Sequence, residues 1–169
     1  MPNDGERVAA KAVLRSRMQQ RLTELRSDER DSRSKQICGR IVHSPEWQEA
    51  KRIVLFVPLR SEPDISGLNE EARSEQKVIT TIAPTIRVEA ELQFGTDKID
   101  LIVVPGLAFS RDSHRLGRGG GFFDRLLAGP AAEAYNLGVC FDFQLLESIP
   151  IEPHDIVMDT VATEEFTER

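Results

Sequence analysis

Short apolar runs rich in branched residues alternate with segments of helical periodicity, and this alternation strongly constrains the fold. The clearest run is IVLFVPL at residues 53–59, which is almost continuously apolar. Such a run is typical of a strand that is covered on both faces. Further strands are expected at 78–83, 99–104 and 137–141, with helices at 61–76 and 122–127. Strand alternating with helix predicts an α/β fold with a mostly parallel central sheet.

The N-terminal part of the chain, about residues 7–50, has a helical pattern instead. Apolar residues recur at spacings of four and three, which places one stripe on a helix from residue 7 to 25: Leu14, Met18, Leu22 and Leu25. Ser27 is the expected N-cap of a second helix, and Ser44 with Pro45 the expected start of a third. The full expectation is a three-layer Rossmann-like sandwich with an N-terminal helical segment, formed by residues 1–169 as a single domain.

Composition and charge exclude several classes of protein. The formal net charge of −6 does not favour binding to nucleic acid. The two cysteines, Cys38 and Cys140, form no CxxC or Cys/His pattern, so neither a disulfide framework nor a zinc site is indicated. No apolar run approaches the roughly 18 residues of a membrane span. We therefore expect a cytoplasmic monomer that binds neither nucleic acid nor membranes.

The stretch RLGRGGGFFD, residues 115–124, is the main candidate for a functional site. It follows the expected strand at 99–104, and open α/β sheets bind ligands beyond the carboxyl ends of their strands. Its four glycines, Gly117, Gly119, Gly120 and Gly121, would let backbone N–H groups approach a ligand, next to the N-terminus of a helix. Arg115 and Arg118 can add bidentate contacts to phosphate. These features favour an anion site, although glycine-rich stretches also form plain turns.

Asp124 closes this stretch, and a carboxylate beside a phosphate is repulsive unless a cation lies between them. A Mg²⁺ ion, held by one or two carboxylates together with phosphates and water, would resolve the conflict. Asp155, in the motif PHDIVMD, is a candidate second carboxylate. The pattern therefore predicts Mg²⁺-nucleotide binding, although an Asp in a first helical turn can also simply interact with the helix dipole. No GK[ST] follows, so the stretch is not a P-loop.

Residues 100–125, DLIVVPGLAFSRDSHRLGRGGGFFDR, resemble the signature of the 5-formyltetrahydrofolate cyclo-ligases, also called methenyltetrahydrofolate synthetases. The resemblance implies that Asp124 and Asp155 hold Mg²⁺, with Asp159 a weaker alternative, and that Glu62 contacts the folate. It also implies a set of ATP-binding residues: Lys11, Arg15, Arg115, Leu116, Gly117, Arg118, Gly119, Gly120, Gly121, Phe122 and Phe123. The C-terminal residues Gln144, Pro150 and the run PHDIVMDTVATE extend the similarity.

The activity that this resemblance implies is the ATP-dependent conversion of 5-formyltetrahydrofolate to 5,10-methenyltetrahydrofolate. The γ-phosphoryl group would be transferred to the formyl oxygen, after which N10 attacks the activated carbon and phosphate leaves. Arg115 and Arg118 would act as catalytic residues that stabilise charge on the phosphoryl group. ATP is the co-substrate and Mg²⁺ the cofactor. None of the three histidines is required, and only His154, next to Asp155, is a candidate for a role.

Among the departures from the family pattern, one concerns two rings of the loop and another concerns the segment at 85–98, and the second keeps alternatives open. Phe122 and Phe123 replace the usual tyrosines, which keeps the rings but removes two hydroxyl groups. The segment at 85–98 is also shorter than in the family and lacks a GIxEP-like element that helps to form the wall of the site. The alternatives are an ATP-dependent ligase or kinase-like relative with a different substrate, or a non-catalytic nucleotide-binding module.

Overall fold

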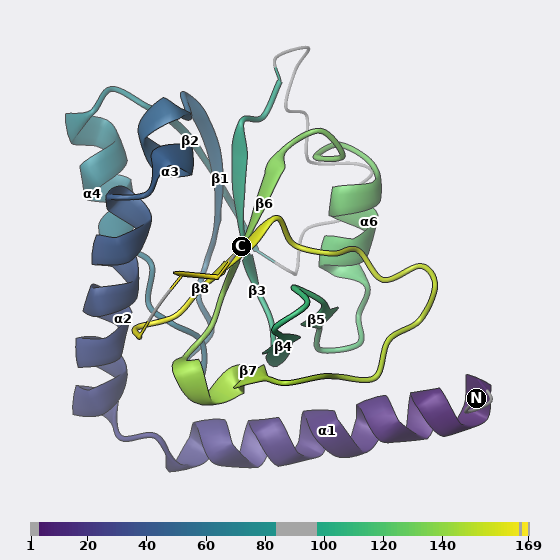
Figure 1. Ribbon diagram of the computed structural model, residues 1–169. Helices are drawn as coiled ribbons and strands as arrows, with labels where there is room; N and C mark the ends of the chain where they lie inside the picture. Colours follow the sequence, from purple (N-terminus) through teal and green to yellow (C-terminus); the bar gives the residue numbers. More distant parts are fainter. Residues whose placement is uncertain (1–3, 84–97, 166, 169) are drawn as a thin grey trace.

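A central six-stranded sheet organises the molecule, as the computed structural model shows (Figure 1). The structure describes residues 4–83, 98–165 and 167–168. The strand order is β2-β1-β3-β6-β8-β9, and only β9 is antiparallel to its neighbour. The strands are β1 (Arg52–Phe56), β2 (Val78–Ile82), β3 (Leu101–Pro105), β6 (Tyr135–Val139), β8 (Thr160–Ala162) and β9 (Thr167–Glu168). The shortened segment at 85–98 falls mainly outside the described residues.

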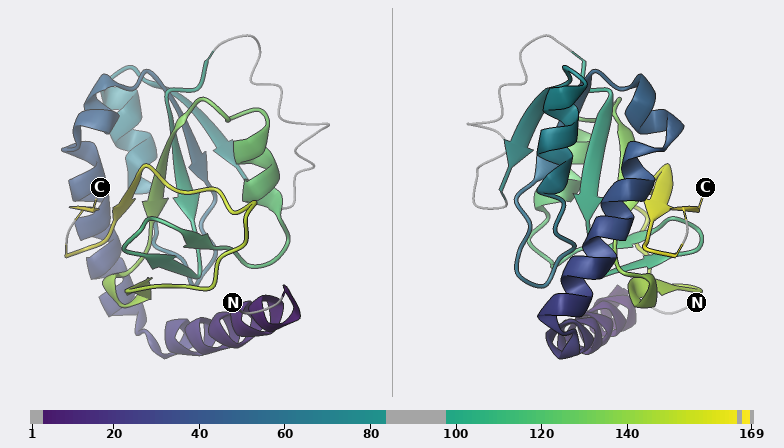
Figure 2. Two further views of the ribbon diagram at one scale, coloured as in Figure 1. Left: turned by 45° about the vertical axis from the view of Figure 1, so that its right-hand side comes forward. Right: turned by 90° about the vertical axis from the view of Figure 1, so that its left-hand side faces the viewer.

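Helices cover both faces of this sheet, which confirms the predicted three-layer α/β fold (Figures 1 and 2). One face carries α2 (Ser27–Val42), α3 (Pro45–Glu49) and α4 (Gly67–Ser74), and the other carries α6 (Phe122–Ala128). Burial on both faces explains why β3 is apolar throughout, since all of its residues are buried. One hydrophobic cluster joins Met18 of the first helix to Ala162 of β8.

The first helix, α1 (Asp4–Glu24), follows the predicted stripe, because Met18 and Leu22 are buried. Ser44 is the N-cap of α3, as predicted, since its hydroxyl accepts a hydrogen bond from the backbone N–H of Trp47 at 3.2 Å. The prediction that Ser27 is the N-cap of the second helix is wrong. Arg26 occupies the N-cap position of α2 without a side-chain cap, and Ser27 is the first helical residue.

In the segment that follows β1, two boundaries differ from the expected ones. The strand ends at Phe56 rather than residue 59, and Pro58 in this stretch has no N–H to donate to a sheet. The following helix begins at Gly67 rather than residue 61. Pro63 disfavours helical geometry at Glu62, and Asp64 accepts a hydrogen bond from the backbone N–H of Ser66 at 3.0 Å. Residues 57–66 therefore form a loop at the carboxyl end of β1.

The strand order places this loop at the point where the chain reverses direction across the sheet. From β1 the chain moves outward to β2, and it then crosses back to β3 on the opposite side of β1. Ligands of open α/β sheets bind in the crevice at such a switch point, outside the carboxyl ends of the strands. A site is therefore expected where the loops after β1 and β3 meet.

A second, three-stranded sheet, which the sequence pattern did not predict, lies beyond β3. It has the order β5-β4-β7 and consists of β4 (Ala108–Ser110), β5 (Arg115–Leu116) and β7 (Leu145–Leu146). In Figure 1, α1 runs along this edge of the molecule, below the small sheet. No helix within the described residues is both long and apolar enough to cross a membrane.

Candidate functional site

The glycine-rich loop, residues 117–121, connects β5 to α6 at the carboxyl edge of the sheet. Gly119 has a φ of 100° and Gly121 a φ of 67°, in the left-handed region that residues with a side chain rarely adopt. Gly119 and Gly120 are exposed. The loop therefore takes a path that glycine permits, and it presents bare backbone to solvent.

Arg115 is fixed beneath this loop. Its side chain is only 5% exposed, and it donates to the Pro105 carbonyl at 3.3 Å and to Oδ1 of Asp124 at 2.6 Å. The guanidinium carbon lies 5.7 Å from the centre of the Phe123 ring. Asp124 is 44% exposed, so its carboxylate remains accessible from solvent.

The apolar residues of the candidate stretch are part of the core. Leu116 is 1% exposed, and Phe122 and Phe123 are 8% and 7% exposed. The two rings pack edge to face with 5.1 Å between their centres. The two phenylalanines that replace the tyrosines of the family pattern are therefore both buried. What these three residues can offer a ligand is mainly their backbone.

Two cations of α1 reach the same region. Arg15 donates through Nε to the carbonyl of Gly117 at 2.9 Å. Lys11, which is 5% exposed, donates to Oε2 of Glu152 at 2.6 Å and to the two oxygens of Asp155 at 2.9 and 2.7 Å. The KxxxR spacing puts both side chains on one face of the helix. One turn of α1 thus supplies a cation to the glycine-rich loop and another to the loop that carries Asp155.

Glu152 is a participant that the sequence did not reveal, although it lies only three residues before Asp155. Its hydrogen bond from Lys11 is the main cause that lowers its pKa below the ordinary value of 4.5. Glu152, His154 and Asp155 place one potential ligand atom each within 4.8 Å of the others. Asp124 is not in this group, and it and Asp155 pair with different cations.

Glu62 joins the loop after β1 to the glycine-rich loop. Its side chain is 7% exposed, and its Oε1 accepts from Nε of Arg118 at 3.1 Å. Its Oε2 accepts from the backbone N–H of Leu59 at 2.8 Å. Arg118 also donates to the hydroxyl of Ser61 at 2.9 Å. The structure thus brings Glu62 and Arg118 together at the switch point between β1 and β3.

Gln144 holds the loop after β3 through its side-chain amide. The residue is 1% exposed, and its amide donates to the carbonyls of Gly106 and Leu107 at 3.1 and 3.0 Å. Its oxygen accepts from the backbone N–H of Phe141 at 2.9 Å. The amide is therefore fully used in supporting the turn from which the candidate site is built.

This arrangement suits an anion that carries several charges. Each of Lys11, Arg115 and Arg118 is paired with an internal carboxylate, and Arg15 is bonded to a carbonyl. Phosphate groups can take over these cations, while the released carboxylates remain available to a divalent cation or to a second ligand. The cations lie around a loop whose backbone is itself open to an anion.

Comparison with known proteins gives a consistent result. The family model described as the 5-formyltetrahydrofolate cyclo-ligase family matches residues 7–97 and 81–164. The chain is 26% identical over 195 aligned positions to the mouse 5-formyltetrahydrofolate cyclo-ligase, with 93% of this chain and 95% of the mouse protein covered. It is 30% identical over 120 positions to the enzyme of the same name from Escherichia coli K12, with 69% and 65% covered.

The fold is also similar to that of a solved relative. The solution structure of the 5,10-methenyltetrahydrofolate synthetase from Aquifex aeolicus superposes with a TM-score of 0.76 at 27% sequence identity. The superposition covers 95% of this chain and 92% of the other. The similarity therefore extends over nearly the whole of both proteins.

Proposed function

Because this chain belongs to the 5-formyltetrahydrofolate cyclo-ligase family, we propose that it converts 5-formyltetrahydrofolate to 5,10-methenyltetrahydrofolate with consumption of ATP. The observation that carries the proposal is the placement of Arg15, Arg115 and Arg118 around a glycine-rich loop at the switch point of the sheet. This combination provides both fixed charge and open backbone for a triphosphate.

ATP binding is assigned to the loop and to the cations around it. Lys11, Arg15, Arg115 and Arg118 would bind phosphate oxygens, and the N–H groups of residues 117–121 would approach the same oxygens. The proposal is supported by the burial of Lys11 and Arg115, because a cation held in one position does not have to be ordered again when phosphate binds. Leu116, Phe122 and Phe123 would line the loop from below.

The folate is assigned to the loop after β1. Glu62 would accept hydrogen bonds from N–H groups of the folate ring once Arg118 has moved to a phosphate. Val57 and Leu59 of the same loop are 49% and 41% exposed, so apolar surface lies next to this buried carboxylate. A flat ring with polar edges requires this combination of apolar contact and a precisely placed acceptor.

The reaction needs no nucleophilic side chain from the protein. The formyl oxygen attacks the γ-phosphorus and ADP leaves, which converts a poor leaving group into a phosphate ester. N10 then attacks the activated carbon, phosphate departs, and N10 loses its proton. Arg115 and Arg118 act as the catalytic residues by stabilising negative charge on the phosphoryl group as it is transferred.

Mg²⁺ is proposed as the cofactor, with Asp124 and Asp155 as its carboxylate ligands. The exposed carboxylate of Asp124 fits this role, because a Mg²⁺ site commonly combines one or two carboxylates with phosphate oxygens and water. Asp155 would bind the ion after Lys11 has moved to a phosphate. Bound Mg²⁺ would neutralise charge on the phosphates and orient them.

We further propose a single domain that acts as a monomer in the cytoplasm. The single-domain assignment is supported by the hydrophobic cluster that extends from α1 to β8. The location is supported by Cys38 and Cys140, which are both free, as is usual in a reducing compartment.

One assay tests the proposed reaction. The protein is mixed with Mg-ATP and 5-formyltetrahydrofolate, and the methenyl chromophore and ADP are followed together. Equal formation of both is the expected result. ADP without the chromophore would indicate a related enzyme with a different substrate, and nucleotide binding without turnover would indicate a non-catalytic module.

A further inference from the structure

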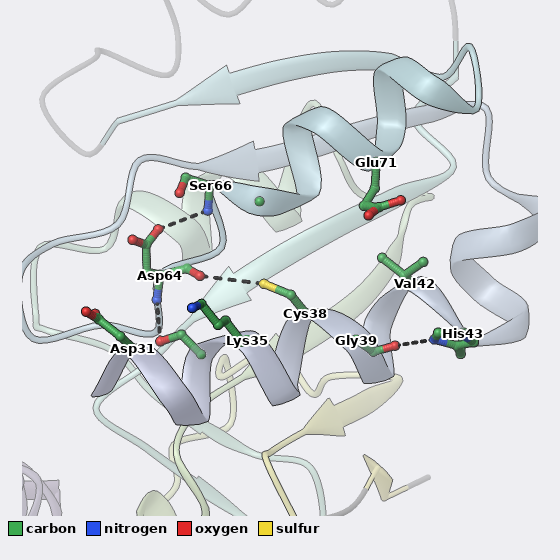
Figure 3. Close-up of a pocket in the computed structure, with 11 residues that line it drawn as sticks. Asp31, Lys35, Cys38, Gly39, Val42, His43, Asp64, Ser66 and Glu71 are labelled. Carbon is green, nitrogen blue, oxygen red and sulfur yellow. Dashed lines mark hydrogen bonds between the residues drawn. The ribbon is translucent and has the colours of Figure 1, made fainter. Parts of the chain in front are cut away.

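Three side chains of α2 reach from one face of the helix to the loop that carries Glu62. Arg30 donates through Nε to the carbonyl of Glu62 at 2.9 Å. The hydroxyl of Ser34 accepts from the backbone N–H of Asp64 at 2.9 Å, and the thiol of Cys38 donates to the Asp64 carbonyl at 3.5 Å. The spacing of four residues aligns the three side chains along α2. Figure 3 shows the contacts between Cys38 and Asp64 and between Asp64 and Ser66.

Two of the three side chains are largely shielded from water. Ser34 is 2% exposed, and the side chain of Arg30 is 19% exposed. Burial is the main cause that raises the pKa of the Cys38 thiol to about 11, so this group stays protonated at neutral pH and can donate. Removing the buried Ser34 Oγ would take away the acceptor of the Asp64 backbone N–H and would thereby disturb the backbone of Asp64 itself.

Ile65 anchors the end of this loop in the core, where it is 1% exposed. A cavity of about 540 Å³ lies between α2 and α4, lined by Ser34, Cys38, Asp64 and Ser66 among others (Figure 3). The hydrogen bonds from Ser34 and Cys38 hold Asp64 beside this cavity. From Asp64, the constraint passes along two residues of backbone to Glu62, whose carbonyl Arg30 also holds.

We propose that Arg30, Ser34 and Cys38 are positioning residues for Glu62, and that they set the affinity for the folate substrate more than the affinity for ATP. This inference rests on the proposed function. Lys11 and Arg15 of α1 donate to the loop that carries Asp155 and to the carbonyl of Gly117, outside the segment that α2 holds. Of the proposed phosphate-binding side chains, Arg118 donates to that segment, at Ser61 and Glu62. Displacing the loop after β1 therefore moves the folate acceptor while most of the phosphate-binding groups stay in place.

The test is a comparison of Michaelis constants in Ser34→Ala. The KM for 5-formyltetrahydrofolate is expected to rise about five- to tenfold, as for a lost hydrogen bond to a buried group, with the KM for ATP changed less than about twofold. Amide hydrogen exchange at Asp64 should accelerate in the same variant. Arg30→Ala removes a different bond to the same loop and should give the same split, and Arg30→Lys, which keeps a donor, should restore part of it. Lys35→Ala, an exposed residue of the same helix, is the matched control.

The outcomes separate the two proposals. If the unmodified protein turns over but the variants change both KM values equally, or change neither, the positioning role alone is rejected. A lower kcat in Ser34→Ala with both KM values unchanged would show that Ser34 affects only the fraction of protein that is folded. This outcome would also reject the positioning role. Absence of turnover in the unmodified protein would reject the proposed function and, with it, the role of these residues in folate binding.

Discussion

Nε of Arg118 donates to Oε1 of Glu62 at 3.1 Å, so one ion pair connects the glycine-rich loop to the loop after β1. The proposed function assigns the arginine to ATP and the carboxylate to folate. Each group must therefore leave the other before both substrates are bound. A phosphate that takes Arg118 frees Oε1 of Glu62, which couples the two binding events favourably.

Glu62→Gln should consequently have opposite effects on the two substrates. We expect a non-hydrolysable ATP analogue to bind about two- to fivefold more tightly, because the partly exposed ion pair no longer competes for Arg118. The KM for the folate should rise by at least about tenfold, as for the loss of a charged acceptor. Calorimetry and steady-state kinetics measure the two effects. Glu70→Gln, at an exposed position of α4, is the control, and weaker nucleotide binding in Glu62→Gln would contradict the coupling.

Asp124→Asn tests the metal assignment while keeping an acceptor for Arg115. Turnover with Mg-ATP should fall by at least about 100-fold, because a carboxylate at the phosphoryl group is lost. The melting temperature should stay within about 4 °C, since the buried guanidinium remains hydrogen-bonded. Asp112→Asn, at an exposed turn of the same chain segment, should retain full activity. Full activity in Asp124→Asn would rule out Asp124 as the Mg²⁺ ligand.

Gly121→Ala and Gly120→Ala form a matched pair within the loop. The positive φ of Gly121 should make its substitution cost about 1–2 kcal/mol of unfolding free energy. An added Cβ would also lie 2.9 Å from Nη1 of Arg125. At Gly120 no atom lies within 4 Å of that position, so stability should change by less than about 0.5 kcal/mol. Urea unfolding distinguishes them, and equal stability of the two variants would exclude strain at Gly121.

Asp100→Asn should change how stability depends on pH. The hydrogen bond from the backbone N–H of Arg52 is the largest cause that lowers the pKa of Asp100 from its ordinary value of 3.8. A depressed pKa adds stability that is fully present above the unfolded-state value and is lost as the pH falls through the folded-state value. The stability difference between the unmodified protein and Asp100→Asn should thus be constant near neutral pH and shrink below about pH 4. Urea unfolding at a series of pH values measures the difference, and a difference that grows in acid would refute the assignment.

The sequence predicted most elements of the main sheet because each leaves a local pattern. The run that begins at Ile53 and the stripe of α1 needed only neighbouring residues for their recognition. The small sheet was missed for the opposite reason. Its strands are two or three residues long, and they exist because Phe109 pairs with Arg115 and with Leu145. No periodicity can reveal strands of that length.

The candidate site divides in the same way. Its glycine-rich loop could be found from the sequence, because glycine, arginine and aspartate within ten residues already indicate anion chemistry. Glu152 and the contacts of α2 with the loop after β1 could not, because they depend on partners that lie in other elements. In the sequence, Arg30 and Ser34 look like ordinary residues of a polar helix.

The sequence by itself therefore determined the fold class, the family resemblance and the loop around which the site is built. Only the tertiary structure decided which charges face each other. Arg118 meets Glu62 across 56 positions of chain, and Lys11 meets Asp155 across 144. Periodicity and turn chemistry act over a few residues, whereas these pairs form only after the parallel sheet brings the carboxyl ends of distant strands to one edge.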